Sequence, residues 1–114
     1  MNIIEKPWGK EEIFVNNDFY VVKRLTMNAS CKCSLQYHKQ KTETIYVLQG
    51  PLFLHHNYNI HDLEVIQCNT GEVFTIFPGT IHRMEAKETN AIYLECSTPQ
   101  LDDVVRIEDD YSRV

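Results

Sequence analysis

Short stretches in which apolar and polar residues alternate dominate the chain. In the range 43–49, Glu43, Ile45 and Val47 fall on one side of an extended strand, and the residues between them fall on the other. No segment keeps apolar residues at helical spacing over several turns, so the pattern favours strands. Strands are predicted over 20–27, 31–38, 42–49, 52–56, 63–67, 73–76, 81–86, 91–96 and 104–107.

Turn-forming residues separate the predicted strands at short intervals. Gly50-Pro51, Asn69-Thr70-Gly71 and Pro78-Gly79 each lie between two apolar alternations. About eight to ten short strands in one chain imply a sandwich or a small barrel, which is an all-β fold. Because 114 residues is the length of one domain, we expect a single domain over 1–114.

Composition and charge narrow the classes of function. The formal net charge of −5 argues against a nucleic-acid surface, which needs clustered Lys and Arg, but it allows a small phosphorylated ligand. No apolar run approaches the roughly 20 residues that span a bilayer. Residues 1–6 contain Glu5 and no apolar signal core. We therefore expect a cytoplasmic protein without a nucleic-acid or membrane partner.

The four cysteines, Cys31, Cys33, Cys68 and Cys96, allow two interpretations. Cys31 and Cys33 are too close along a strand to form a disulfide with each other, but the four thiols could form a zinc site. In a cytosolic chain, thiols within strands are usually small buried hydrophobes, and we favour that interpretation.

A set of polar residues in the middle of the chain predicts a metal site. Gln36 and His38 are two residues apart, so both side chains leave the same face of a strand. Glu43 shares its face with Ile45 and Val47, and a carboxylate in an apolar interior is costly unless it is paired or metal-bound. Two imidazoles, a carboxylate and an amide oxygen suit a divalent metal, with zinc preferred and iron, manganese or nickel also admissible. The predicted ligands are Gln36, His38, Glu43 and His82; the alternative is a pocket that holds no metal tightly.

A second imidazole group and the single tryptophan indicate a function less specifically than the predicted metal ligands do. His55, His56 and His61 flank an Asn-rich turn and could form a surface metal site, but we favour an exposed polar hairpin. Trp8 is interpreted as a lid or a core anchor rather than as a platform for stacking a sugar.

The order of the predicted ligands resembles the two motifs of the cupin superfamily. Cupins are small jelly-roll barrels with a metal inside, so the resemblance implies that fold. The opening Lys6-Pro7-Trp8-Gly9 and the tail 102–113 are similar to the cupin domain of type II mannose-6-phosphate isomerases. That domain often forms the C-terminal half of a bifunctional enzyme with mannose-1-phosphate guanylyltransferase. The two motifs are Gln36-x-His38-x4-Glu43-x6-Gly50 and Gly71-x5-Phe77-Pro78-Gly79-x2-His82.

The chain departs from the pattern of that family at three places. Lys41 stands where the family commonly carries an Arg, Thr44-Ile45 where it often has His-Trp, and Ser112 where its tail has Gly. A Lys can hold a phosphate as a point charge, but it lacks the bidentate fork of Arg.

The resemblance implies a metal-dependent isomerase that interconverts mannose 6-phosphate and fructose 6-phosphate. Such an enzyme needs a base near the carbon-bound proton and cations for the phosphate, for which the candidates are Lys39, Lys41, Arg106 and Arg113. We expect Lys41, Glu43 and Arg113 to act in catalysis, and Lys39, Glu95 and Arg106 to bind the substrate. The alternatives are a solvated loop for Lys39 and Lys41, and ion pairing within the acidic tail for Arg106 and Arg113.

Two other functions are considered. The departures around Lys41 suggest a non-catalytic cupin that binds a sugar or another metabolite. An iron-dependent oxygenase is the third candidate, although Gln36 in place of a His argues against it. Because cupins commonly pair through their edge strands, the resemblance also implies a homodimer.

Overall fold

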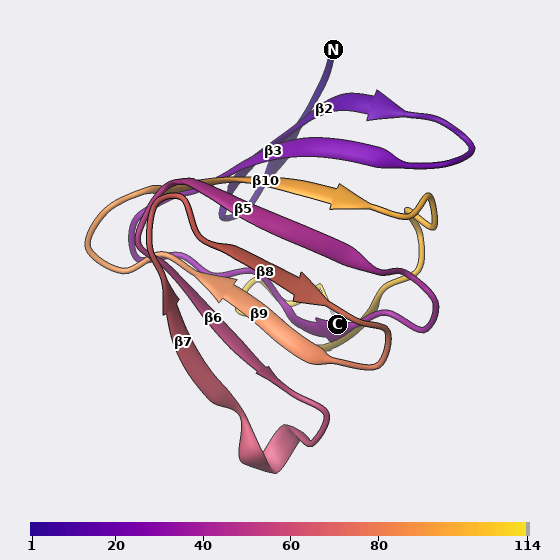
Figure 1. Cartoon of the computed structure of the whole chain (residues 1–114). Helices are drawn as coiled ribbons and strands as arrows, with labels where there is room; N and C mark the ends of the chain where they lie inside the picture. The colour runs from indigo at the N-terminus through magenta and orange to yellow at the C-terminus, as the bar shows by residue number, and fades with distance from the viewer. Residues whose placement is uncertain (114) are drawn as a thin grey trace.

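The computed structural model describes residues 1–113, which form two antiparallel sheets packed face to face (Figure 1). One sheet has six strands in the order β1-β2-β3-β10-β5-β8, and the other has five in the order β11-β4-β9-β6-β7. The strands are β1 Asn2–Lys6, β2 Gly9–Asn16, β3 Val21–Met27, β4 Leu35–Tyr37, β5 Glu43–Gln49, β6 Leu52–Asn57, β7 Glu64–Cys68, β8 Val73–Ile76, β9 Ile81–Glu85, β10 Ala91–Ser97 and β11 Val105–Glu108. The all-β prediction is confirmed, and the two sheets form a compact β-sandwich.

Nine of these strands match the predicted ranges to within a few residues, and two were not predicted. β1 and β2 precede the first predicted strand, and β2 begins with Gly9 followed by three charged residues. Because these charged residues lie on both faces of the strand, the sequence there shows no alternation of apolar and polar residues. The predicted strand 31–38 is regular only over Leu35–Tyr37, because residues 31–34 contribute a single isolated bridge between Lys32 and Glu85.

The hydrophobic core lies between the two sheets. Glu43, Ile45 and Val47 of β5 are all buried, as their alternation predicted. Each fully buried Leu, Ile or Val side chain stabilises the fold by roughly 1.5–3 kcal/mol. The core also contains Leu25, Met27, Leu52, Leu54, Ile76, Met84 and Tyr93.

The turn between β1 and β2 closes one end of the core. Trp8 is buried there, which confirms its interpretation as a core anchor. Gly9 has a φ of 154°, and a Cβ on it would lie 1.8 Å from the backbone oxygen of Thr26. Only glycine fits this close approach between strands, so the Trp-Gly pair both anchors the turn and lets it reach β3.

The four cysteines differ in how far they are buried. Cys33 and Cys68 are buried, Cys31 is half-buried, and Cys96 is exposed, so the buried interpretation is wrong for Cys96. Cys96 lies on the face of β10 that points away from the core.

Two histidines of the second imidazole group contact neighbouring side chains. The imidazole of His55 pairs with the Glu85 carboxylate at 2.9 Å. The imidazole of His56 packs against the Phe74 ring with centroids 5.0 Å apart.

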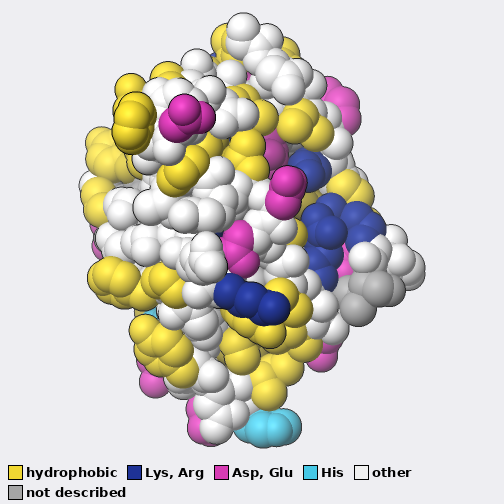
Figure 2. Space-filling view, turned by 90° about the vertical axis from the view of Figure 1, so that its right-hand side faces the viewer, with side chains coloured by type: hydrophobic (Ala, Val, Ile, Leu, Met, Phe, Trp, Pro, Cys, Tyr) yellow, Lys and Arg dark blue, Asp and Glu magenta, His cyan; other side chains and the backbone are white. Residues whose placement is uncertain are grey.

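One face of the molecule mixes exposed apolar and charged side chains (Figure 2). Hydrophobic side chains appear there at several separate points rather than as one continuous patch. Within residues 1–113, no helix has the length and apolar character needed to cross a membrane.

Candidate metal centre

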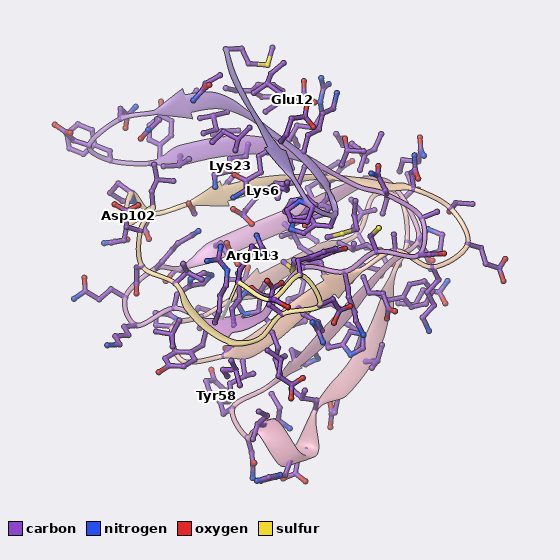
Figure 3. The ribbon with its side chains drawn as sticks, turned by 180° about the vertical axis from the view of Figure 1, so that it is seen from behind. Lys6, Glu12, Lys23, Tyr58, Asp102 and Arg113 are labelled. Carbon is purple, nitrogen blue, oxygen red and sulfur yellow. The ribbon has the colours of Figure 1, made fainter. Side chains whose placement is uncertain are left out.

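A cavity of about 290 Å³ is lined by residues of both sheets and of the C-terminal segment. Lys6 and Lys23 come from the six-stranded sheet, while Asp102 and Arg113 come from the C-terminal segment (Figure 3). The predicted site residues that line the cavity are Gln36, His38, Lys41, Glu43, Glu95, Arg106 and Arg113. Most of the predicted site therefore converges on one cavity, although its members are spread over most of the chain.

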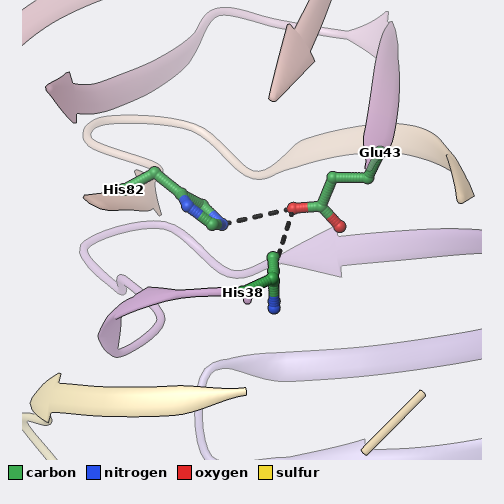
Figure 4. A group of neighbouring side chains, drawn as sticks. All are labelled: His38, Glu43 and His82. Atoms are coloured by element: carbon green, nitrogen blue, oxygen red, sulfur yellow. Dashed lines mark ion pairs between the residues drawn. The ribbon is translucent and has the colours of Figure 1, made fainter. Parts of the chain in front are cut away.

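Three buried side chains, His38, Glu43 and His82, meet beside this cavity, and the first two line it (Figure 4). Glu43 begins β5 in the six-stranded sheet, His82 lies on β9 in the five-stranded sheet, and His38 directly follows β4. The alternation of β5 turns Glu43 toward the opposite sheet, where both imidazoles lie. The cluster thus joins the two sheets.

The spacing of the three side chains fits a metal ion. Glu43 Oε1 lies 3.4 Å from His38 Nε2 and 3.2 Å from His82 Nε2. Ligand atoms of all three residues lie within 4.8 Å of one another. Ligands bound about 2.1 Å from a tetrahedral metal are about 3.4 Å apart, so these separations agree with the requirements of zinc.

Hydrogen bonds at the far side of each ring fix how the imidazoles present their nitrogens. His82 Nδ1 donates to the Thr80 carbonyl at 2.8 Å, and His38 Nδ1 donates to the Asp103 carbonyl. A carbonyl can only accept, so both Nδ1 atoms carry a proton. In a neutral ring Nε2 then keeps a lone pair that can bind a metal, whereas in a protonated ring Nε2–H donates to the Glu43 carboxylate. Neither Nε2 has a hydrogen-bond partner within the described chain. Buried acceptors that face one another need a cation between them, and the residues therefore fit a divalent metal.

Glu43 is held in the charged form that a metal ligand requires. Burial alone would raise the pKa of Glu43, but the His38 and His82 rings and the Lys41 ammonium outweigh it. The net effect is a pKa well below the ordinary value for a glutamate. The carboxylate is therefore ionised at neutral pH.

Gln36 lies beside the His38–Glu43–His82 cluster, but its side-chain oxygen is hydrogen-bonded to another residue. It pairs with His82 in the register of β4 and β9 and lines the cavity. Its side-chain oxygen accepts a hydrogen bond from Ser34 Oγ at 2.6 Å. An amide oxygen has a second lone pair, so ligation by Gln36 stays a prediction.

A row of alternating charges runs across the inner face of the six-stranded sheet. Consecutive Nζ–carboxylate distances along it are 3.8, 3.1, 4.0, 3.9 and 3.4 Å. This row begins at the edge strand β1 and ends at Glu43, in the His38–Glu43–His82 cluster. Its members, in order, are Lys6, Glu11, Lys23, Glu95, Lys41 and Glu43.

Two members of this row can hold or move a proton beside the metal cluster. Burial and the nearby Glu43 carboxylate raise the pKa of Glu95 to about 8, against the opposing effect of Lys41 and Lys23. Burial lowers the pKa of Lys41, but Glu95 and Glu43 together more than reverse this and leave it raised. The solvated-loop interpretation is therefore wrong for Lys41, which is buried and paired.

Lys39 and Arg113 differ from the other predicted site residues. Lys39 is exposed and its side chain does not line the cavity, which agrees with the solvated-loop interpretation. Arg113 lines the cavity but also pairs with Asp109, with Nε at 2.7 Å and Nη2 at 3.0 Å. Ion pairing within the tail is thus confirmed for Arg113, while its catalytic role stays a prediction.

Asp103 is a site residue that the sequence did not reveal. Its carboxylate accepts backbone N–H groups of Lys39, Gln40 and Lys41 at 3.0, 2.7 and 2.9 Å. Its carbonyl orients His38. Asp103 therefore holds the loop before Glu43, but its partners lie 62–65 residues away in sequence, beyond the reach of any local pattern.

Comparison with known proteins places the chain in a family. The family described as mannose-6-phosphate isomerase C-terminal matches residues 2–109. A curated relative, mannose-1-phosphate guanylyltransferase of Salmonella muenchen, is 26% identical over 107 residues. This match covers 90% of the chain and 22% of the relative, so the chain spans about a fifth of the relative's length.

Solved structures share the fold at low sequence identity. The capsular polysaccharide assembling protein CapF from Staphylococcus aureus is 19% identical, with a TM-score of 0.77 over 94% of this chain and 34% of its own. Lactobacillus farciminis oxalate decarboxylase is 15% identical, with a TM-score of 0.79 over 93% of this chain and 33% of its own. KdgF from Halomonas sp. is 15% identical, with a TM-score of 0.74 over 90% of each chain. The chain, a cupin by fold, belongs to the mannose-6-phosphate isomerase C-terminal family.

Proposed function

We propose that this cupin is a metal-dependent isomerase of a sugar phosphate, of the type that interconverts mannose 6-phosphate and fructose 6-phosphate. The observation that carries the proposal is the His38–Glu43–His82 cluster, which adjoins a cavity that also holds the Lys41–Glu95 pair. Membership of the family supports the substrate class.

The charge of the cavity supports an anionic substrate. Five cationic and four anionic side chains line it, in a chain whose formal net charge is −5. A bound divalent metal would add two further positive charges. The interior is therefore locally positive, and a positive cavity concentrates anions.

The reaction requires a proton to move between two neighbouring carbons of the sugar. A metal held by His38, Glu43 and His82 would polarise the carbonyl oxygen of the substrate. Glu95 takes the proton from C2 and returns it to C1, since a carboxyl group with a pKa of about 8 is suited to both steps near neutral pH. Lys41 Nζ lies 3.4 Å from Glu43 Oε2 and 3.9 Å from Glu95 Oε2. Its ammonium gives a proton to O1 as the enediol forms and regains one from the C2 hydroxyl as O2 becomes the new carbonyl oxygen.

An aldose–ketose assay on hexose and pentose phosphates with added divalent metals tests the proposal. We expect turnover by the wild type and a loss of at least about a hundredfold in kcat for Glu95→Gln, because the proton acceptor is removed. Glu85→Gln is the matched control, since Glu85 pairs with His55 outside the cavity. Absence of turnover with every sugar phosphate and metal would contradict the proposal.

A non-catalytic sugar-binding cupin is the second candidate. The observation that favours it is that Lys41, at the position of the family's Arg, is engaged by two carboxylates. This function predicts that sugar phosphates raise the melting temperature without being converted.

A further inference from the structure

We infer that Arg106 binds the anionic group of the ligand, a phosphate or a carboxylate, inside the cavity. The inference rests on the proposed function only in taking this cavity as the ligand site. It selects one residue from four cations that the sequence left open for this role, Lys39, Lys41, Arg106 and Arg113.

The other cations that line the cavity already have carboxylate partners. Arg113 is bound bidentately by Asp109 and is therefore less available to a ligand. The lysine–carboxylate pairs are Lys6 with Glu11 at 3.8 Å, Lys23 with Glu11 at 3.1 Å and Lys41 with Glu43 at 3.4 Å.

Arg106 is the exception. Within residues 1–113 no carboxylate lies within 4.0 Å of its guanidinium, and its Nε is buried without a hydrogen-bond acceptor. A buried donor that lacks an acceptor destabilises the fold, and it does so more when the group is charged. An oxyanion in the cavity would supply that acceptor, because the guanidinium fork matches both carboxylate and phosphate.

The register of the five-stranded sheet places Arg106 within reach of the metal cluster. Arg106 on β11 is directly opposite Gln36 on β4, and Gln36 is directly opposite His82 on β9. Adjacent strands are about 4.8 Å apart, so the backbones at Arg106 and His82 are about 10 Å apart. A small sugar that meets the metal cluster with its carbonyl end can thus extend its anionic group toward β11.

Ligand binding, measured without reference to turnover, tests this assignment. The probes are mannose 6-phosphate, glucuronate and neutral mannose, titrated calorimetrically into wild type, Arg106→Gln, Arg106→Lys and Arg24→Gln. Arg24 is the matched control, because it pairs with Glu12 on the opposite face of the sheet. Melting curves for each variant establish that it is folded.

We expect Arg106→Gln to bind its anionic probe at least about tenfold more weakly, the effect of losing a charge-assisted hydrogen bond. Arg106→Lys should recover part of this loss, and Arg24→Gln should behave as the wild type does. A preference for mannose 6-phosphate identifies a phosphate as the anion, and a preference for glucuronate identifies a carboxylate. In the wild type, either should bind more tightly than mannose.

Three outcomes overturn the assignment. They are unchanged anion binding by folded Arg106→Gln, equal binding of neutral and anionic probes by the wild type, and no binding of either anion. The test distinguishes this assignment from the proposed isomerase activity. If the enzyme turns over and Arg106→Gln leaves KM unchanged, only the role of Arg106 is contradicted. If binding depends on Arg106 but no turnover occurs, only the isomerase activity is contradicted.

Discussion

At the scale of single residues, the metal cluster depends on which atoms of each side chain are already engaged. His38 and His82 use Nδ1 in hydrogen bonds to carbonyls, which leaves Nε2 for Glu43 or a metal. The inward direction of Glu43 could be predicted, because it alternates with two apolar residues on one strand. The orientation of His38 could not, because it depends on Asp103, whose carbonyl comes from a distant segment.

Removing one imidazole should weaken metal binding strongly. We expect His82→Asn to lower zinc affinity by at least about a hundredfold, since one of three strong ligands is lost. Competition with a chromophoric chelator measures this. His55→Asn serves as the control, because His55 pairs with Glu85 outside the cluster. Equal zinc affinity in the two variants would contradict the assignment of the centre.

At the scale of elements, the C-terminal segment supports the site as much as the strands do. It contributes β11, three further residues of the cavity wall at Leu101, Asp102 and Val104, and the Asp103 carboxylate. The sequence predicted β11 itself but not what the segment contacts. β1 and β2 escaped prediction for a related reason, because Lys6 and Glu11 bury charges whose partners lie on other strands.

Removing the Asp103 carboxylate should destabilise the loop that carries Lys41. Asp103→Ala leaves three backbone N–H groups without their acceptor, and we expect a lower free energy of unfolding than in the wild type. Urea denaturation measures it. The neighbouring exposed Asp102 provides the control, and a comparable loss in Asp102→Ala would argue against this specific role.

The Asp109–Arg113 pair should make part of the stability depend on acid. Hydrogen bonds from Arg113 lower the pKa of Asp109 to about 2, below the 3.8 of an ordinary aspartate. A depressed carboxyl pKa stabilises the fold fully above the unfolded value, and this contribution is lost as the pH falls toward the folded value. We expect wild type to exceed Asp109→Asn by about 1–2 kcal/mol at pH 6, with the difference shrinking between pH 4 and pH 2. Denaturation of both proteins across that range measures it, with Glu108→Gln, an exposed neighbour, expected to show no such change.

At the scale of the whole molecule, the two open sheets leave four edge strands, β1, β8, β11 and β7. Val73 on edge strand β8 is exposed, and so is Tyr46, its register partner on β5. An exposed edge with apolar side chains beside it can pair with a second copy of the chain. A homodimer, which the cupin resemblance implies, therefore has a candidate contact at β8.

Light scattering tests the homodimer. We expect a dimer for the wild type and a shift toward monomer for Val73→Lys, because a charge on the edge opposes pairing. Val65→Lys, at an exposed position on edge strand β7, is the control for the other sheet. A wild type that is only monomeric would contradict the expectation, and an unchanged dimer in Val73→Lys would remove β8 as the contact.

The hold of Asp103 on the loop before Glu43 also has a consequence for how the protein is made. During synthesis, His38, Glu43 and His82 emerge from the ribosome before the residue that orients His38. A nascent chain that ends at Gln100 has every predicted ligand but lacks the carbonyl and the carboxylate of Asp103. We therefore expect tight metal binding at His38, Glu43 and His82 only after Asp103 has docked against the loop before Glu43.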